Sequence, residues 1–302
     1  RAIMIDNNTG SVLSGEVVLQ NCSFKDLKDD QTSAAGGTAK VYAICKSLIV
    51  SSCDFVENVN KTHGGNISHL YAKANNVEIL DSNFTRGLCA GTDSGVTISA
   101  ENVWVERCTF LLNADGGLSL AANYGVIANS EFLSNKQNGG LKLNKLGEKS
   151  SVEIIDTNFT NYVTDGYTES NGNISTSSGS AIYVSSGVNL RLSGEINVTK
   201  NIVDTTNTTT SGAIYVAKDG KFVITRGSKV VISDNTVHST TSNNTSNLVF
   251  ANENDTTFLE GGLLDGSSIG ITIQNGGNVV AQSPTNIPLE TSDINKLFSD
   301  DT

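Results

Sequence analysis

The sequence has little charge, proline or methionine. Charged residues make up 17% of its 302 residues, and it contains two prolines and one methionine. Soluble domains typically have about 25% charged residues, so we expect hydroxyl and amide side chains to cover most of the surface. The 29 glycines and the frequent Ser, Thr and Asn predict short strands joined by polar turns.

The sequence also lacks a basic stripe and a long apolar run. Its net charge is -11, its pI is near 4.7, and its 20 Lys and Arg residues are scattered. We therefore expect no nucleic-acid partner, because phosphate binding requires clustered positive charge. No apolar segment approaches the roughly 20 residues that span a bilayer, so we expect no membrane insertion in this segment. The sequence begins at Arg1 and shows neither a signal peptide nor an initiator Met. We therefore expect either a mature protein or a fragment of a longer one.

The five cysteines do not predict a disulfide framework, because an odd number cannot pair completely. Cys22, Cys53 and Cys108 each stand two positions before a Phe and should face inward as small packing residues. In-register Cβ atoms lie about 4.8 Å apart, farther than the roughly 3.5 to 4.5 Å that a disulfide prefers, which disfavours a bond between Cys22 and Cys53. Cys45 and Cys89 lie outside this slot.

A short phrase repeats through the first half of the chain: a Cys, Ser or Thr, one spacer residue, then Phe. It ends at Phe24, Phe55, Phe84, Phe110, Phe132 and Phe159. The loose spacing falls in the range of about 20–50 residues that is typical of solenoid proteins.

Two short strands with alternating apolar residues precede the phrase, for example Val41–Cys45 and Ser47–Val50 before Phe55. One such unit cannot bury its apolar face, but stacked copies can, with parallel pairing between equivalent strands. We therefore predict an all-β fold, a single right-handed parallel β-helix of roughly nine or ten coils, over residues 1–282. An antiparallel sandwich or propeller is the alternative, because Asn-Gly and Asp-Gly pairs typical of hairpins also occur.

The second half of the chain departs from the phrase. Two near-copies, Ser178–Val184 and Ser211–Val216, predict further coils. Residues 283–302 are expected to form a C-terminal cap or linker, in which Asp293–Phe298 resembles an amphipathic turn able to cover the last coil. Polar stretches between the strands predict protruding loops at 164–178, 203–211 and 235–246.

The repeated Phe and Asn residues have predicted structural roles. One inward Phe per coil permits offset stacking, worth about 0.5–1.5 kcal/mol per pair. An Asn three residues after the Phe can pair its amide with the next coil. Phe24, Phe84 and Phe159 lack this Asn.

Two motifs carry a family resemblance. Phe-x-x-Asn occurs at Phe55–Asn58, Phe110–Asn113 and Phe132–Asn135, and Gly-Ala-Ile occurs at Gly212–Ile214 and, weakened, at Gly179–Ile182. Together they resemble the repeats of chlamydial polymorphic membrane proteins and of the wider group of adhesin-like β-helix surface proteins. The resemblance covers roughly residues 15–280, and it implies an extracellular, surface-displayed passenger that adheres.

The acidic residues do not indicate an active site. Asp29-Asp30 and Asp300-Asp301 lie in a loop and at the terminus, outside the motifs of polysaccharide hydrolases that share this fold. Glu153 and Asp156 could serve a glycosidase in principle. With 31 acidic residues on a rod, chance neighbours are expected, so we assign no catalytic residue.

The histidines do not indicate a metal site. His63 and His69 are close in sequence but have no carboxylate at metal-ligand spacing. We therefore assign no metal-binding or cofactor-binding residue and expect no cofactor.

Asn-x-Ser/Thr triplets are frequent, as expected by chance in this composition. Exposed ones would carry glycans if a eukaryote secretes the chain. They begin at Asn7, Asn21, Asn60, Asn66, Asn83, Asn158, Asn173, Asn197, Asn207, Asn243, Asn244 and Asn254.

These features together favour a non-enzymatic extracellular cell-surface protein. We expect an adhesin or rigid surface stalk whose side-face loops bind a receptor or glycan of a host or neighbouring cell through many weak contacts. A self-associating subunit of an extracellular filament or sheath is one alternative. A β-helix protein that binds or cleaves polysaccharide is another.

Overall fold

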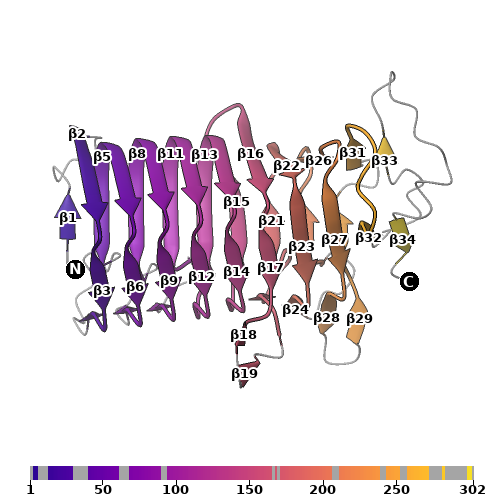
Figure 1. Ribbon diagram of the computed structural model, residues 1–302, viewed down its shortest axis with the longest axis horizontal. Coiled ribbons are helices and arrows are strands. Elements are labelled where there is room, and N and C mark those ends of the chain that lie inside the picture. Colours follow the sequence, from indigo (N-terminus) through magenta and orange to yellow (C-terminus); the bar gives the residue numbers. More distant parts are fainter. Residues whose placement is uncertain are drawn as a thin grey trace.

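The fold is an elongated stack of parallel β-strands, seen in the computed structural model in Figure 1. The structure describes residues 3–5, 13–29, 40–60, 68–89, 94–164, 167–168, 171–205, 211–238, 243–251, 257–271, 281–282 and 298–300. These residues form strands and turns.

The strand bounds are Ile3–Ile5 (β1), Leu13–Gln20 (β2), Ser23–Lys25 (β3), Lys28–Asp29 (β4), Val41–Ser51 (β5), Asp54–Val56 (β6), Val59–Asn60 (β7), Leu70–Leu80 (β8), Asn83–Thr85 (β9), Leu88–Cys89 (β10), Val96–Glu106 (β11), Thr109–Leu111 (β12), Leu118–Ala128 (β13), Glu131–Leu133 (β14), Leu141–Lys145 (β15), Ser150–Ile155 (β16), Asn158–Thr160 (β17), Val163–Thr164 (β18), Tyr167–Thr168 (β19), Ile174–Ser175 (β20), Ile182–Val184 (β21), Val188–Ser193 (β22), Glu195–Thr199 (β23), Ile202–Asp204 (β24), Ile214–Val216 (β25), Lys221–Ile224 (β26), Lys229–Ser233 (β27), Thr236–His238 (β28), Asn243–Thr245 (β29), Leu248–Phe250 (β30), Thr257–Leu259 (β31), Ser268–Ile271 (β32), Ala281–Gln282 (β33) and Phe298–Asp300 (β34).

The strands of the 25-stranded main sheet pair in parallel with equivalent strands of the neighbouring coils. One ladder runs β3, β6, β9, β12, β14, β17, β23, β27, β32 and β34. The 11-residue strands β5, β8 and β11 each run across two faces and pair in register along their length. The predicted parallel β-helix is confirmed, and the antiparallel alternative is wrong. The number of coils stays a prediction.

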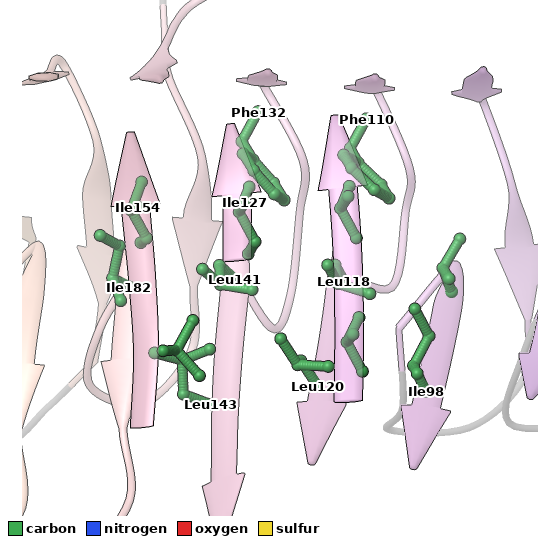
Figure 2. Close-up of a cluster of buried hydrophobic side chains, with 14 of the residues drawn as sticks. Ile98, Phe110, Leu118, Leu120, Ile127, Phe132, Leu141, Leu143, Ile154 and Ile182 are labelled. Atoms are coloured by element: carbon green, nitrogen blue, oxygen red, sulfur yellow. The ribbon is translucent and has the colours of Figure 1, made fainter. Parts of the chain in front are cut away.

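Alternation along the strands sends every second side chain inward. In β8, Leu70 and Ala72 are buried while Tyr71 and Lys73 face outward, and the same alternation resumes with Val77 and Ile79 further along the strand. Figure 2 shows the resulting core, in which leucines and isoleucines from successive coils lie below Phe110 and Phe132 in the view. Period-two sequence and stacking together therefore produce one continuous apolar interior.

Left-handed corner residues explain the repeated phrase. Arg107 has φ 52° and Leu112 has φ 53°, and they flank the short strand β12 on either side. The chain therefore turns sharply before Cys108 and again before Asn113, which points Cys108, Phe110 and Asn113 inward, where all three are buried.

The Phe column forms as predicted and then continues with other residues. Neighbouring rings from Phe24 to Phe159 stack with centroids 4.6 to 5.2 Å apart. In register with Phe159 come Val198, Ile232 and Ile269. In the second half of the chain, the inward position of the Phe column is therefore retained but is occupied by Val or Ile.

The C-terminal strand β34 pairs in parallel with β32, and Phe298 packs against the core. Phe298 therefore lies in a strand, so its predicted place in an amphipathic turn is wrong; the rest of that segment, 293–297, lies outside the described residues. Strand pairing continues beyond 282, while the predicted division at 282 stays a prediction.

Candidate functional site

Short strands and two antiparallel hairpins on one edge of the stack form a surface feature that we term the edge lobe. It comprises the hairpin β18–β19, the parallel strands β20, β24 and β28, and β29, which pairs antiparallel with β28. Figure 1 shows β18–β19 and β28–β29 extending from the lower edge of the stack.

The edge lobe gathers the three predicted loops. Strand β20 lies in 164–178, β24 lies partly in 203–211 and β28–β29 lies in 235–246, and these strands are neighbours in one sheet. The prediction that these segments are loops is therefore wrong in part, because they contain paired strands. Residues 206–210 and 239–242 lie outside the described residues.

A buried ladder of side-chain amides supports the base of the edge lobe. In each step the Nδ2 of one Asn donates to the Oδ1 of the next, with distances of 2.7 to 3.0 Å from Asn113 onward. This confirms the predicted amide ladder and extends it. The Asn ladder consists of Asn58, Asn113, Asn135, Asn173, Asn201, Asn235 and Asn247, with His69 inserted between Asn58 and Asn113.

Two missing Asn residues of the repeat are replaced from elsewhere in the chain. After Phe159 the hairpin β18–β19 intervenes, and Asn173 then occupies the ladder position, donating to the carbonyl of Phe132. After Phe84 the position is Gly87, and the His69 side chain occupies the space. Sequence spacing did not reveal either substitution, because both residues lie outside the Phe-x-x-Asn motif.

His69 is a structural residue, since both ring nitrogens are used in the ladder. Asn58 Nδ2 donates to His69 Nδ1 at 3.1 Å, and His69 Nε2 donates to Asn113 Oδ1 at 3.0 Å. Full burial lowers the pKa of His69 from 6.5 to about 4, so the ring is neutral at pH 7. Both ring nitrogens are engaged in these hydrogen bonds, so neither presents a free lone pair to a metal ion. His63 lies outside the described residues.

The thiols are also structural. Cys22, Cys45, Cys53 and Cys108 are free, as predicted for Cys22 and Cys53. Burial raises the pKa of Cys45 and Cys53, and it raises the pKa of Cys108 to about 12. Since the thiolate is the reactive form, these buried groups are poor nucleophiles at neutral pH.

The carboxylates considered for glycosidase chemistry are engaged separately. Glu153 lies 3.5 Å from Nε of Arg191, whereas Asp156 accepts a hydrogen bond from the Glu195 backbone at 2.7 Å. Across the described ranges, no three His, Cys, Asp or Glu side chains come together as a metal site would require.

The exposed chemistry of the edge lobe is that of a contact surface. Val163 is 60% exposed, and Thr164, Asp204, Asn244 and Thr245 are also exposed. Such side chains offer hydrogen bonds and a small apolar contact.

No family model, curated protein or solved structure matches this chain. In the part of the chain that the structure describes, no helix is long and apolar enough to cross a membrane.

Proposed function

We propose that this chain is a non-enzymatic extracellular surface protein that adheres through its edge lobe. The observation that carries the proposal is the gathering of three polar segments into one four-stranded sheet at one edge of the stack, where the hairpin β18–β19 also projects. Segments that share one edge present a combined surface, whereas scattered segments would not.

The buried Asn ladder supports this role by fixing the base of the edge lobe. The backbone N–H of Asn173 bonds to Asn201 Oδ1, and that of Asn201 bonds to Asn235 Oδ1, both at 2.9 Å. Contacts made by the lobe therefore rest on an ordered platform, so little ordering is needed on binding. Similarity of the repeat motifs to chlamydial polymorphic membrane proteins and other adhesin-like β-helix proteins agrees with a ligand on a host or neighbouring cell.

An exchange of the hairpin tests the proposal. Residues 163–170 are replaced by a short Gly-Ser linker, while Asn173 is retained so that the ladder stays complete. Beads coated with this variant should capture far fewer epithelial or bacterial cells than beads coated with the unaltered chain, with the far-UV circular dichroism unchanged. Undiminished capture would overturn the assignment of adhesion to the edge lobe.

A further inference from the structure

Two exposed aromatic rings lie together on an outward face that the edge lobe does not include. Trp104 on β11 is 40% exposed and Tyr124 on β13 is 51% exposed. Trp104 is in register with Val126, and Asn102 is in register with Tyr124. The two residues are therefore diagonal neighbours on adjacent parallel strands, one strand spacing apart across the sheet and two residues apart along it, which places their Cα atoms about 8 Å apart. We term them the aromatic pair.

A covered apolar side chain lies beside the aromatic pair. Val126 lies on the same outward row as Trp104, yet only 2% of it is exposed, so its neighbours on this face cover it. The next residue on this row is Glu153, so the apolar surface is confined to the aromatic pair and Val126.

The indole of Trp104 is held in place by polar contacts at its edge. Its Nε1 donates to Glu106 Oε2 at 2.9 Å. Arg107 in turn pairs with Glu106 and, at 2.6 Å, with Asp81. A ring already fixed in this way loses little rotamer freedom when a ligand covers it.

Polar groups border the rings on the side of β8. Asn102 Nδ2 donates to Asn76 Oδ1 at 2.9 Å, and both side chains are exposed. Glu78 is exposed, lies in register with Trp104 and takes part in no ion pair among the described residues. This border offers hydrogen-bond acceptors and donors, and its carboxylate disfavours an anionic ligand.

We propose that the aromatic pair binds a neutral, extended glycan of pyranose rings. A pyranose ring has an apolar C–H face, which fits over Trp104 or Tyr124, and a rim of hydroxyl groups, which fits Asn102 and Glu78. The ligand must be extended and flat because both rings lie on one sheet face. The amides of Asn76 and Asn102 can both donate to and accept from hydroxyl groups. A purely cationic ligand would contact only the Glu78 carboxylate and the two rings, so the amides favour a hydroxyl-rich ligand. This inference does not rest on adhesion by the edge lobe.

Intrinsic fluorescence tests the proposal at the site itself, because Trp104 is the only tryptophan. The chain is titrated with cellohexaose, with chitohexaose, with a galacturonate hexamer and with hexalysine. We expect a saturable change in Trp104 emission with a neutral hexasaccharide, and binding of the galacturonate hexamer weaker by about tenfold. Tyr124→Ala should weaken neutral-sugar binding by about tenfold with unchanged thermal unfolding. Phe258→Ala, which removes an exposed ring elsewhere, should leave binding unchanged.

Three results would overturn the proposal: no saturable change with either neutral hexasaccharide, equal or tighter binding of hexalysine or galacturonate, or full binding by Tyr124→Ala. The chain with the exchanged hairpin should still bind the sugar, which separates this site from the edge lobe.

Discussion

Gly87 and His69 together fill one position of the Asn ladder: a Cβ atom on Gly87 would lie 2.5 Å from Nε2 of His69. The absence of a side chain at one residue makes room for the side chain of the other. The ladder therefore continues through a coil that has no Asn at this position. In that coil the imidazole of His69 accepts a hydrogen bond from Asn58 and donates one to Asn113.

This relationship predicts strong coupling between the two positions. In a Ser68→Ala background, which removes the hydroxyl closest to the new side chain, Gly87→Asn and His69→Gly should each destabilise the fold by about 2 kcal/mol or more. The first crowds the ladder and the second leaves Asn58 and Asn113 without their partner. The double variant should recover at least about 1 kcal/mol, measured by urea unfolding. Additive losses would contradict the complementarity.

The buried imidazole predicts a loss of stability in acid. The pKa of His69 is about 4 in the folded chain and 6.5 in its ordinary state. Between these values the unfolded chain binds more protons, so stability falls as the pH drops from about 6.5 to about 4, by about 3 kcal/mol in total, and His69 has no effect above that window.

Unfolding measured across this pH range checks the prediction. His69→Asn, which cannot titrate, should show a shallower decline than the unaltered chain. Parallel declines in the unaltered chain and His69→Asn would contradict it.

The ladder amides should contribute far more than exposed amides. Asn135→Ala removes the bonds to Phe110 O and Asn173 Oδ1. It also removes the Oδ1 that accepts from the backbone N–H and from Nδ2 of Asn113, and Nδ2 keeps only its bond to Phe84 O. We expect a loss of about 3 kcal/mol or more. Asn144→Ala removes two partly buried bonds, one to Ser119 and a long one of 3.4 Å from Ser185, and should cost less than about 1 kcal/mol. The losses are measured by denaturant unfolding. Similar losses from the two variants would contradict the larger contribution assigned to the buried ladder amides.

The Phe column should be sensitive to truncation. Phe132 is fully buried between Phe110 and Phe159, at ring distances of 4.6 and 4.7 Å. Phe132→Ala should cost about 3–5 kcal/mol, measured by thermal unfolding, whereas Phe258→Ala should cost less than about 1 kcal/mol because that ring is exposed. An equal cost at both positions would count against ring stacking as a source of stability.

Burial also decides which Asn-x-Ser/Thr sites can carry a glycan. Asn173 is fully buried, whereas Asn83 is exposed. When the chain is secreted from a eukaryotic host, glycopeptide mass spectrometry of the folded fraction should find sugar at Asn83 and none at Asn173. A glycan on Asn173 in folded protein would be incompatible with its ladder bonds.

The sequence by itself determined the parallel β-helix, the stack from Phe24 to Phe159, the inward thiols and the amide pairing of Asn113 with Asn135. These features follow from period-two alternation and a repeated local phrase, which specify the direction of each side chain without knowledge of distant contacts. The right-handed sense and the number of coils stay predictions from the sequence.

Only the tertiary structure decided which residues share a slot. An insertion such as β18–β19 changes sequence distance without changing the spatial position to which the chain returns, so Asn173 was not recognisable as a ladder residue. The His69 side chain likewise takes a ladder position that belongs by sequence spacing to Gly87, because Gly87 has no side chain to fill it. The edge lobe and the aromatic pair likewise depend on register between coils, which local sequence does not specify because neighbouring strands lie far apart in the chain.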